Sequence, residues 1–243
     1  MKKKYDKSNL ASFSVNDSSM EIIEDGLNRK IRKIIRLNES IKKEVSLVFK
    51  YTLNYIEQLK DAGIDLPKIY ENYHTDEEII FVCEYMGENI TDYVQPNRFE
   101  TTLKDENIFQ YMFDCLKKAQ NADINFDPHP KNYVLQDGII TYVDFTPPWH
   151  QNYYDLRISN SSNESEEKVM KEFFLCFHPN EIGYHFAGDL LKMHDNIYPM
   201  LPLLYKELSS RNIISSSYKD FISKAEMIKK RELAREENNI YLL

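Results

Sequence analysis

Glycine is scarce in this chain, since only 6 of its 243 residues are glycine. A loop that wraps phosphate groups in backbone N–H groups needs several glycines close together. Near the N-terminal end of the chain Gly26 stands alone. The sequence therefore excludes a glycine-rich phosphate loop ahead of the strand that we predict at 29–37.

Cysteine is also rare, and long apolar runs are missing. Cys83, Cys115 and Cys176 are odd in number and widely spaced, which excludes a zinc pattern or disulfide framework and favours a reducing compartment. The lysines at 2–4 are not followed by an apolar run, and no stretch approaches the roughly 20 apolar residues of a membrane span. We therefore expect a cytoplasmic protein with no signal peptide and no membrane partner.

Positive charge is in deficit, because the formal net charge is -8. A nucleic-acid binder relies on Lys and Arg to neutralise phosphates, so we expect no nucleic-acid partner. An acidic surface suits a cationic substrate, but it is equally typical of many cytoplasmic proteins. The hydrophobic content of 42% supports a core, and the length suffices for one large domain or for two lobes with a cleft between them.

Alternating apolar residues predict two strands near the N-terminus, at 20–23 and 29–37, joined by a turn at 24–26. In the second strand Lys33 falls on the mainly apolar face, where lysine is uncommon. Lys33 therefore either reaches a buried site or extends past the sheet edge into solvent. Arg36 takes its place if the register of this strand is shifted.

Apolar residues at helical spacing predict a helix over 41–62, which Asn38 or Ser40 can cap and Gly63 ends. Glu44 lies in the first turn, a position that the helix dipole alone favours for a carboxylate.

Two further strands are predicted at 66–70 and 78–85, and the second leads into a bend or turn at Gly87. The rest of the chain is mainly helical, with helices expected at 105–121, 166–176, 183–196, 198–209 and 217–237. His178, His185 and His194 lack metal-ligand spacing, so we interpret them as surface or core histidines.

The most informative stretch is NFDPHPKN at 125–132. It precedes an Asp-Gly pair at 137–138 between two apolar segments, which is a strong hairpin signal. The hairpin places Asp127, Asn132 and Asp144 at one end of a small sheet. Carboxylate and amide oxygens gathered in this way suit Mg²⁺. Taken one at a time, the Asp-Pro and Asp-Gly pairs are also ordinary turn residues.

This stretch resembles the catalytic core of the protein-kinase-like fold, in the form used by aminoglycoside and choline-type small-molecule kinases. Their catalytic loop reads roughly His-Gly-Asp-x-His-Pro-x-Asn, and their metal loop begins Asp-Phe, which here matches Asp144-Phe145. Asn125 replaces the leading His, and Thr146 replaces the Gly after the metal-loop pair. The resemblance covers about residues 29–156, with its most specific motifs at 127–145.

The resemblance implies a role for each matching residue near this motif. Asp127 would accept or orient the proton of the acceptor hydroxyl, and Asn132 and Asp144 would hold the Mg²⁺ ions that bridge the phosphates. His129 and Asp155 would support the catalytic loop.

Earlier in the chain, the resemblance implies that Lys33 reaches the phosphates of ATP, with Arg36 as its rival. A glutamate on the helix at 41–62 would pair with the lysine; Glu44 is favoured over Glu57. The small-molecule branch often lacks a glycine-rich loop, so the scarcity of glycine does not decide against it.

The fold that the resemblance implies is α+β and bilobal, with a strand-rich N-terminal lobe at 1–86 and a larger helical lobe at 87–243. Backbone groups of Glu84 and Met86 would bind the adenine of ATP between the lobes. Because only a short Pro-Pro-Trp segment follows Asp144-Phe145, without the Ala-Pro-Glu ending of protein kinases, the expected acceptor is a small molecule.

Three alternatives remain open from the sequence. A catalytically silent pseudokinase that acts as a binding module is supported by Asn125 and by the scarcity of glycine. A kinase-fold enzyme that transfers a nucleotidyl group, or one that modifies a protein, would keep the same site residues. Trp149 is as well suited to core packing as to lining an acceptor pocket.

Overall fold

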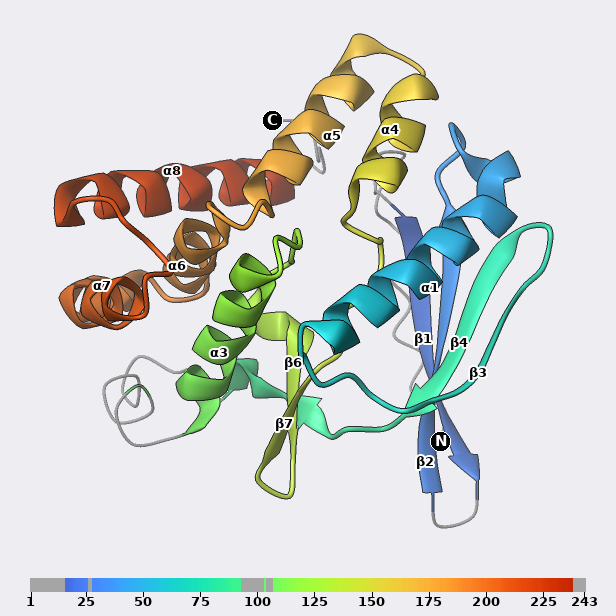
Figure 1. Ribbon diagram of the computed structural model, residues 1–243, viewed down its shortest axis with the longest axis horizontal. Coiled ribbons are helices and arrows are strands. Elements are labelled where there is room, and N and C mark those ends of the chain that lie inside the picture. The colour runs from blue at the N-terminus through green and yellow to red at the C-terminus, as the bar shows by residue number, and fades with distance from the viewer. Residues whose placement is uncertain (1–15, 26–27, 93–102, 104–106, 238–243) are drawn as a thin grey trace.

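The computed structural model describes residues 16–25, 28–92, 103 and 107–237 and shows a mixed α+β chain (Figure 1). A four-stranded sheet with one long helix comes first, followed by a three-stranded sheet and a series of helices. The α+β class predicted from the sequence is thereby confirmed. None of the described helices is both long and apolar enough to cross a membrane. The division into lobes at residue 86 stays a prediction.

The larger sheet is antiparallel throughout, with the order β1-β2-β4-β3. Its strands are β1 (Asn16–Asp25), β2 (Asn28–Leu37), β4 (Glu78–Glu84) and β3 (Ile69–His74). Ile35 and Leu37 of β2 are buried, and Lys33 shares their face as predicted. The strand expected at 66–70 begins only at Ile69, because Pro67 has no N–H to donate to a ladder.

The predicted helix over 41–62 forms as a short 3-10 turn, Lys42–Glu44, followed by α1 (Val45–Asp61). Its buried side packs against β3 and β4. Gly63 ends it with a φ of 79°, as expected. The predicted cap is wrong: Asn38 Oδ1 accepts a hydrogen bond from the Ser40 N–H at 2.9 Å, and the Ser40 hydroxyl oxygen lies at the same distance from it. These two side chains therefore close the turn ahead of the helix instead of capping it.

The smaller sheet has the order β5-β6-β7 and contains the predicted hairpin. Its strands are β5 (Glu88–Asn89), β6 (Tyr133–Gln136) and β7 (Ile139–Tyr142). Asp137 and Gly138 between β6 and β7 have φ values of 51° and 81°. Two successive positive φ values are the hairpin turn that an Asp-Gly pair favours.

Gly87 joins the two sheets, and alanine at this position is expected to destabilise the protein. Its φ is 100°, and an added Cβ would lie 2.1 Å from the carbonyl oxygen of Leu135. Gly138 is the matched control, since its φ is 81° and nothing lies within 4 Å of a Cβ there. We expect Gly87→Ala to lower the free energy of unfolding by about 1–3 kcal/mol more than Gly138→Ala does. The reason is that the added methyl group clashes with neighbouring atoms at position 87 and meets none at position 138. Urea denaturation measures both, and equal losses would contradict this placement.

The remaining helices build the larger part of the chain. They are α3 (Asn107–Asn121), α4 (Gln151–Ser159), α5 (Glu164–Cys176), α6 (Ile182–Met193), α7 (Leu201–Ser210) and α8 (Tyr218–Glu237). Residues 182–191 of α6 are all buried, and this helix packs against α8. The helix α6 is therefore the central element of this part of the chain.

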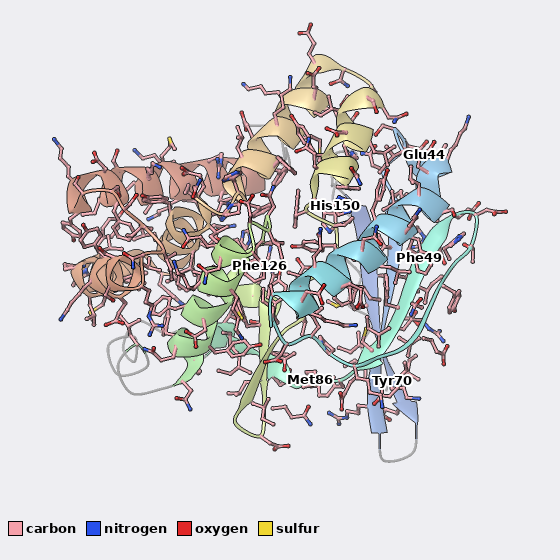
Figure 2. All side chains as sticks on the ribbon, viewed as in Figure 1. Glu44, Phe49, Tyr70, Met86, Phe126 and His150 are labelled. Atoms are coloured by element: carbon pink, nitrogen blue, oxygen red, sulfur yellow. The ribbon has the colours of Figure 1, made fainter. Side chains whose placement is uncertain are left out.

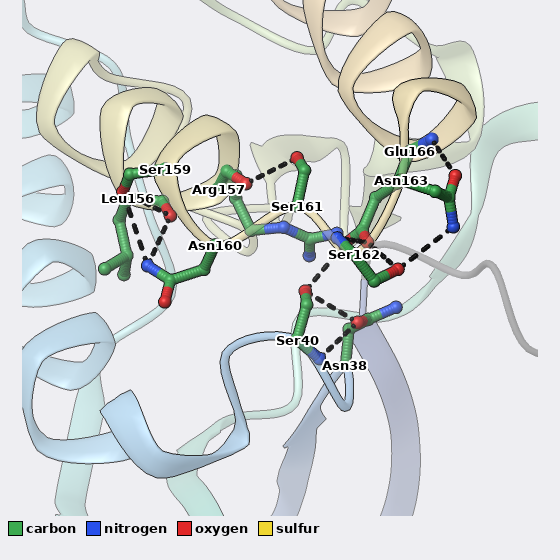
Figure 3. Close-up of polar contacts among 10 residues, drawn as sticks. All are labelled: Asn38, Ser40, Leu156, Arg157, Ser159, Asn160, Ser161, Ser162, Asn163 and Glu166. Atoms are coloured by element: carbon green, nitrogen blue, oxygen red, sulfur yellow. Dashed lines mark hydrogen bonds and ion pairs between the residues drawn. The ribbon is translucent and has the colours of Figure 1, made fainter.

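A buried ion pair joins α4 and α5 to the loop that follows β2 (Figure 3). Arg157 donates to Glu166 Oε1 at 2.9 Å, and only 2% of Arg157 and 6% of Glu166 is exposed. Ser40 donates its hydroxyl to the same oxygen at 2.6 Å, while the N–H and hydroxyl of Ser162 bind Oε2. Burial acts to raise the pKa of Glu166, but these hydrogen bonds and the charge of Arg157 together lower it.

Candidate active site

The candidate active site forms where the two sheets meet, around an ion pair between Lys33 and Asp144. Lys33 Nζ, from the middle of β2, lies 3.0 Å from Asp144 Oδ1, just beyond β7. These residues are 111 positions apart in the chain, and both side chains are mostly buried. Lys33 also lies over the ring of Phe145, which packs edge-on against Phe81 of β4. The phenylalanine after Asp144 thus anchors this segment to the larger sheet.

The other residues predicted for this ion pair, one arginine in place of Lys33 and two glutamates as its partner, lie elsewhere. Arg36 pairs with Glu78 at the exposed end of β2, so it does not replace Lys33. Glu44 lies at the N-terminal end of α1 (Figure 2), and Glu57 pairs with Lys60 on the exposed side of that helix. In the described part of the chain neither glutamate pairs with Lys33, so the predicted lysine–glutamate pair is wrong for this structure. Asp144 is the partner of Lys33 instead, because the hairpin β6-β7 positions this carboxylate against the face of β2.

The hairpin holds the loop at 125–132 directly against Asp144. Tyr142 donates its hydroxyl to the carbonyl oxygen of Asp127 at 3.2 Å, and the Val143 N–H donates to the carbonyl oxygen of Asn132 at 2.8 Å. Asp127 and Asn132 are both buried, with 7% and 6% exposed. The structure therefore brings Asp127, Asn132 and Asp144 to one end of the small sheet, as the hairpin predicts, and Lys33 joins them through its ion pair with Asp144.

Asn125, which the sequence resemblance aligns with a histidine, helps to hold this loop in place. Its side-chain amide donates to the carbonyl oxygen of Phe174, and its own carbonyl accepts from the Tyr55 hydroxyl at 2.8 Å. The Phe126 N–H donates to the carbonyl oxygen of Phe177 at 2.9 Å. The loop is thus fixed to α1 and to the C-terminal end of α5 without a histidine at this position.

Glu84 and Met86 lie at the connection between the sheets, where Figure 2 labels Met86. The Glu84 N–H donates to the carbonyl oxygen of Lys68 at 2.8 Å, so this backbone donor is already used. Met86 is half-buried. Contact of these residues with an adenine ring stays a prediction.

Asp155 does not support the loop at 125–132, so that prediction is wrong. It lies on the exposed side of α4, where Oδ1 accepts from Gln151 Nε2 at 2.7 Å. The helical position one turn after Gln151 directs it along its own helix instead of toward Asp127. The carboxylate that contacts His129 is instead Asp189 of α6, which lies in no recognisable motif of the sequence.

Asp189 joins two histidines beneath the loop. Its Oδ2 lies 3.2 Å from His129 Nε2 and 3.1 Å from His185 Nδ1. His129 Nδ1 in turn contacts Asp127 Oδ1, which also accepts the His129 N–H at 3.1 Å. His129 therefore supports the loop as predicted. His185 is a core histidine, but it belongs to this network, and its spacing of four residues from Asp189 on one helix was the signal available in the sequence.

The charges in this network stabilise one another. Burial acts to lower the pKa of His129 and to raise that of Asp127, but attraction between imidazolium and carboxylate reverses both shifts. Burial likewise acts to lower the pKa of His185, yet Asp189 raises it to about 10. The two histidines also hold the pKa of Asp189 well below its ordinary value. Asp127 is thus kept ionised by a positive charge fixed beneath it.

Two cavities of the described chain lie away from Lys33 and Asp144. One of about 560 Å³ lies near the end of α1 and is lined by Gln58, Asn125 and Trp149, among others. Trp149 is only 4% exposed and packs against Phe177, so it belongs to the core while forming a wall of this cavity. A second cavity, of about 490 Å³, lies near α5 and α8. Neither is lined by Lys33 or Asp144.

Comparison with known proteins gives no family for this chain. It matches no protein-family model, and no curated protein matches it either.

Proposed function

We propose that this protein is a phosphotransferase that moves the terminal phosphate of ATP to a hydroxyl group of a small molecule, in a bilobal fold of the protein-kinase-like type. The observation that carries the proposal is the 3.0 Å pair between Lys33 and Asp144 beside the buried Asp127 and Asn132. A cation, two carboxylates and an amide meet there from segments far apart in the sequence. Phosphoryl transfer asks for this combination, because it depends on positioning and on charge neutralisation.

The side chains fit a Mg²⁺ ion at Asn132 and Asp144. Asn132 Nδ2 is buried and has no hydrogen-bond partner in the described part of the chain, so this donor would suit a phosphate oxygen, while the amide oxygen of the same side chain is the atom that would bind the ion. Asp144 has 21% of its side chain exposed, so it can reach a bound group. When bound, Mg²⁺ neutralises the charge of the phosphates. Lys33 would then contribute its positive charge from the sheet, and Asp127 would accept or orient the proton of the attacking hydroxyl.

The arrangement of the elements supports the two-lobe part of the proposal. The four-stranded sheet and α1 precede Gly87, and the hairpin and most helices follow it. Lys33 comes from the first part, while Asp127, Asn132 and Asp144 come from the second. An active site between two such parts would bind ATP across them, near Glu84 and Met86.

The acceptor is proposed to be an aminoglycoside-like compound, an amino alcohol or a similar small molecule. The net charge of -8 favours a cationic acceptor. The described chain has α4 beginning at Gln151, soon after Asp144, which leaves little room for a long peptide-binding segment. The mass of the product separates this reaction from its alternatives. A phosphate adduct indicates a kinase, a nucleotide adduct indicates a nucleotidyl transferase, and the absence of any adduct indicates a binding module.

Asp144→Ala is expected to abolish the Mg²⁺-dependent part of ATP binding. Calorimetry on the wild-type chain should show tighter ATP binding with Mg²⁺ than without it, and the variant should weaken the Mg²⁺-dependent affinity by about 100-fold or more. Asp76→Ala, in an exposed turn between β3 and β4, is the matched control and should bind as the wild type does. A wild-type chain that binds no nucleotide with any divalent metal would overturn the proposed function.

A further inference from the structure

The network beneath the catalytic loop has the composition of a transition-metal site. His129 Nε2, His185 Nδ1 and an oxygen of Asp189 all lie within 4.8 Å of one another. Two imidazoles and one carboxylate are a ligand set that Zn²⁺ accepts, with a fourth ligand completing a tetrahedron. Mg²⁺ prefers oxygen ligands, so this cluster differs in chemistry from the Asn132–Asp144 pair.

The atoms around the cluster also point to a cation. In metal sites each ligating histidine usually donates its second nitrogen to a carboxylate or carbonyl. Here His129 Nδ1 is held by Asp127, and His185 Nε2 faces Glu232 at 3.8 Å. That distance is too long for a hydrogen bond, and His185 Nε2 and Asp189 Oδ1 are both buried without a hydrogen-bond partner in the described residues. The side chains of the cluster thus leave two of its buried polar atoms without a hydrogen bond.

The surroundings of the cluster also suit a cation. Three carboxyl groups, from Asp127, Asp189 and Glu232, surround the two imidazoles. A divalent ion among them would have its charge compensated by these carboxyl groups instead of being buried alone.

A route of entry lies beside the cluster. Cys176, at the end of α5, lies near His185 and is 7% exposed. It lines the cavity of about 490 Å³, together with Ile228 and Arg231 of α8. An ion entering through this cavity would reach His185, and a water molecule would complete a tetrahedron.

We propose that His129, His185 and Asp189 bind one divalent transition metal of the Zn²⁺ type, with a water molecule as the fourth ligand. The metal would pin the loop at 125–132 to α6 and would be structural, because no ligand has more than 12% of its side chain exposed. This proposal stands on its own residues and does not depend on the proposed phosphotransferase activity.

The test uses the untagged full chain, stripped with a chelator, incubated with Zn²⁺ and dialysed before its metal content is measured by atomic emission. We expect one Zn²⁺ per chain, and an affinity weakened by more than about 100-fold in His185→Gln and in Asp189→Asn. His178→Gln is the matched control, because His178 lies outside the cluster and accepts a hydrogen bond from the Asn180 N–H. Asp144→Ala should also keep its Zn²⁺, so this result is independent of the nucleotide experiment.

Cobalt gives a second readout that needs no folded variant at the histidines. The wild-type chain loaded with Co²⁺ should show the visible absorption of a tetrahedral site, and Cys176→Ser, which removes no ligand, should leave that absorption unchanged. Circular dichroism of each variant checks that it is folded. A folded wild-type chain that retains no Zn²⁺, or variants of His185 and Asp189 that retain it fully, would show that protons alone hold this cluster and would overturn the proposal.

Discussion

Asp127→Asn is expected to slow phosphate transfer by a factor of about 10²–10⁴ while leaving ATP binding unchanged. The substitution removes the carboxylate that would accept or orient the hydroxyl proton, but Asn132 and Asp144 remain to hold Mg²⁺. Asparagine keeps a side-chain oxygen that can accept the His129 N–H, so the loop should retain its shape. The measurement is ADP release with an aminoglycoside or an amino alcohol as the acceptor, together with calorimetry of ATP.

The control for this experiment is Asp137→Asn in the hairpin turn. Asp137 is exposed and has a φ of 51°, and an Asn-Gly pair suits the same turn. This variant should therefore match the wild type in both measurements. If Asp127→Asn bound ATP normally and turned over at the full rate, Asp127 would have no part in the chemistry. If the wild-type chain bound ATP but formed no product with any acceptor, the binding-module alternative would be favoured.

Arg157→Met is expected to lower the free energy of unfolding by about 3–5 kcal/mol. The substitution leaves the Glu166 carboxylate buried among neutral hydrogen-bond donors, without the charge that compensates it. Because Ser40 of the loop after β2 binds the same carboxylate, the loss should loosen the contact between that loop and α5. Urea denaturation followed by circular dichroism measures the change.

A double variant shows whether the unpaired charge causes this loss. Arg157→Met combined with Glu166→Gln removes both charges and should recover about 1–2 kcal/mol relative to Arg157→Met alone. Lys171→Met is the matched control, because Lys171 pairs with Glu167 on the exposed side of α5. That change should cost no more than about 0.5 kcal/mol. A loss as small as this for Arg157→Met would contradict the importance of the buried pair.

Patterns of neighbouring residues in the sequence were sufficient to predict the parts of the structure that depend on local backbone preferences. The Asp-Gly pair gave the hairpin because those two residues adopt positive φ values at little cost. The alternation along β2 put Lys33 on the buried face, and helical spacing gave α1 to within a few residues. The meeting of Asp127, Asn132 and Asp144 also followed from the sequence, because the hairpin connects them directly.

Local patterns failed where the partner comes from a distant segment. The motif residue His129 was selected, but Asp189, which holds it, is 60 positions later and lies on a helix with no recognisable motif. Asp155 was chosen from its place in a pattern, yet its orientation on α4 turns it toward Gln151. Glu44 suited the first turn of a helix, but Asp144 was closer to Lys33 once the sheets came together.

The sequence by itself determined the α+β class, the hairpin, the face of Lys33 and the group of polar residues at 127–144, because each depends on backbone preferences over short distances. The tertiary structure decided the partner of Lys33, the support of Asp127 through His129 and Asp189, and the burial of Arg157 with Glu166. These depend on which helices pack together, and packing of apolar faces is not directional enough to be deduced from the pattern alone.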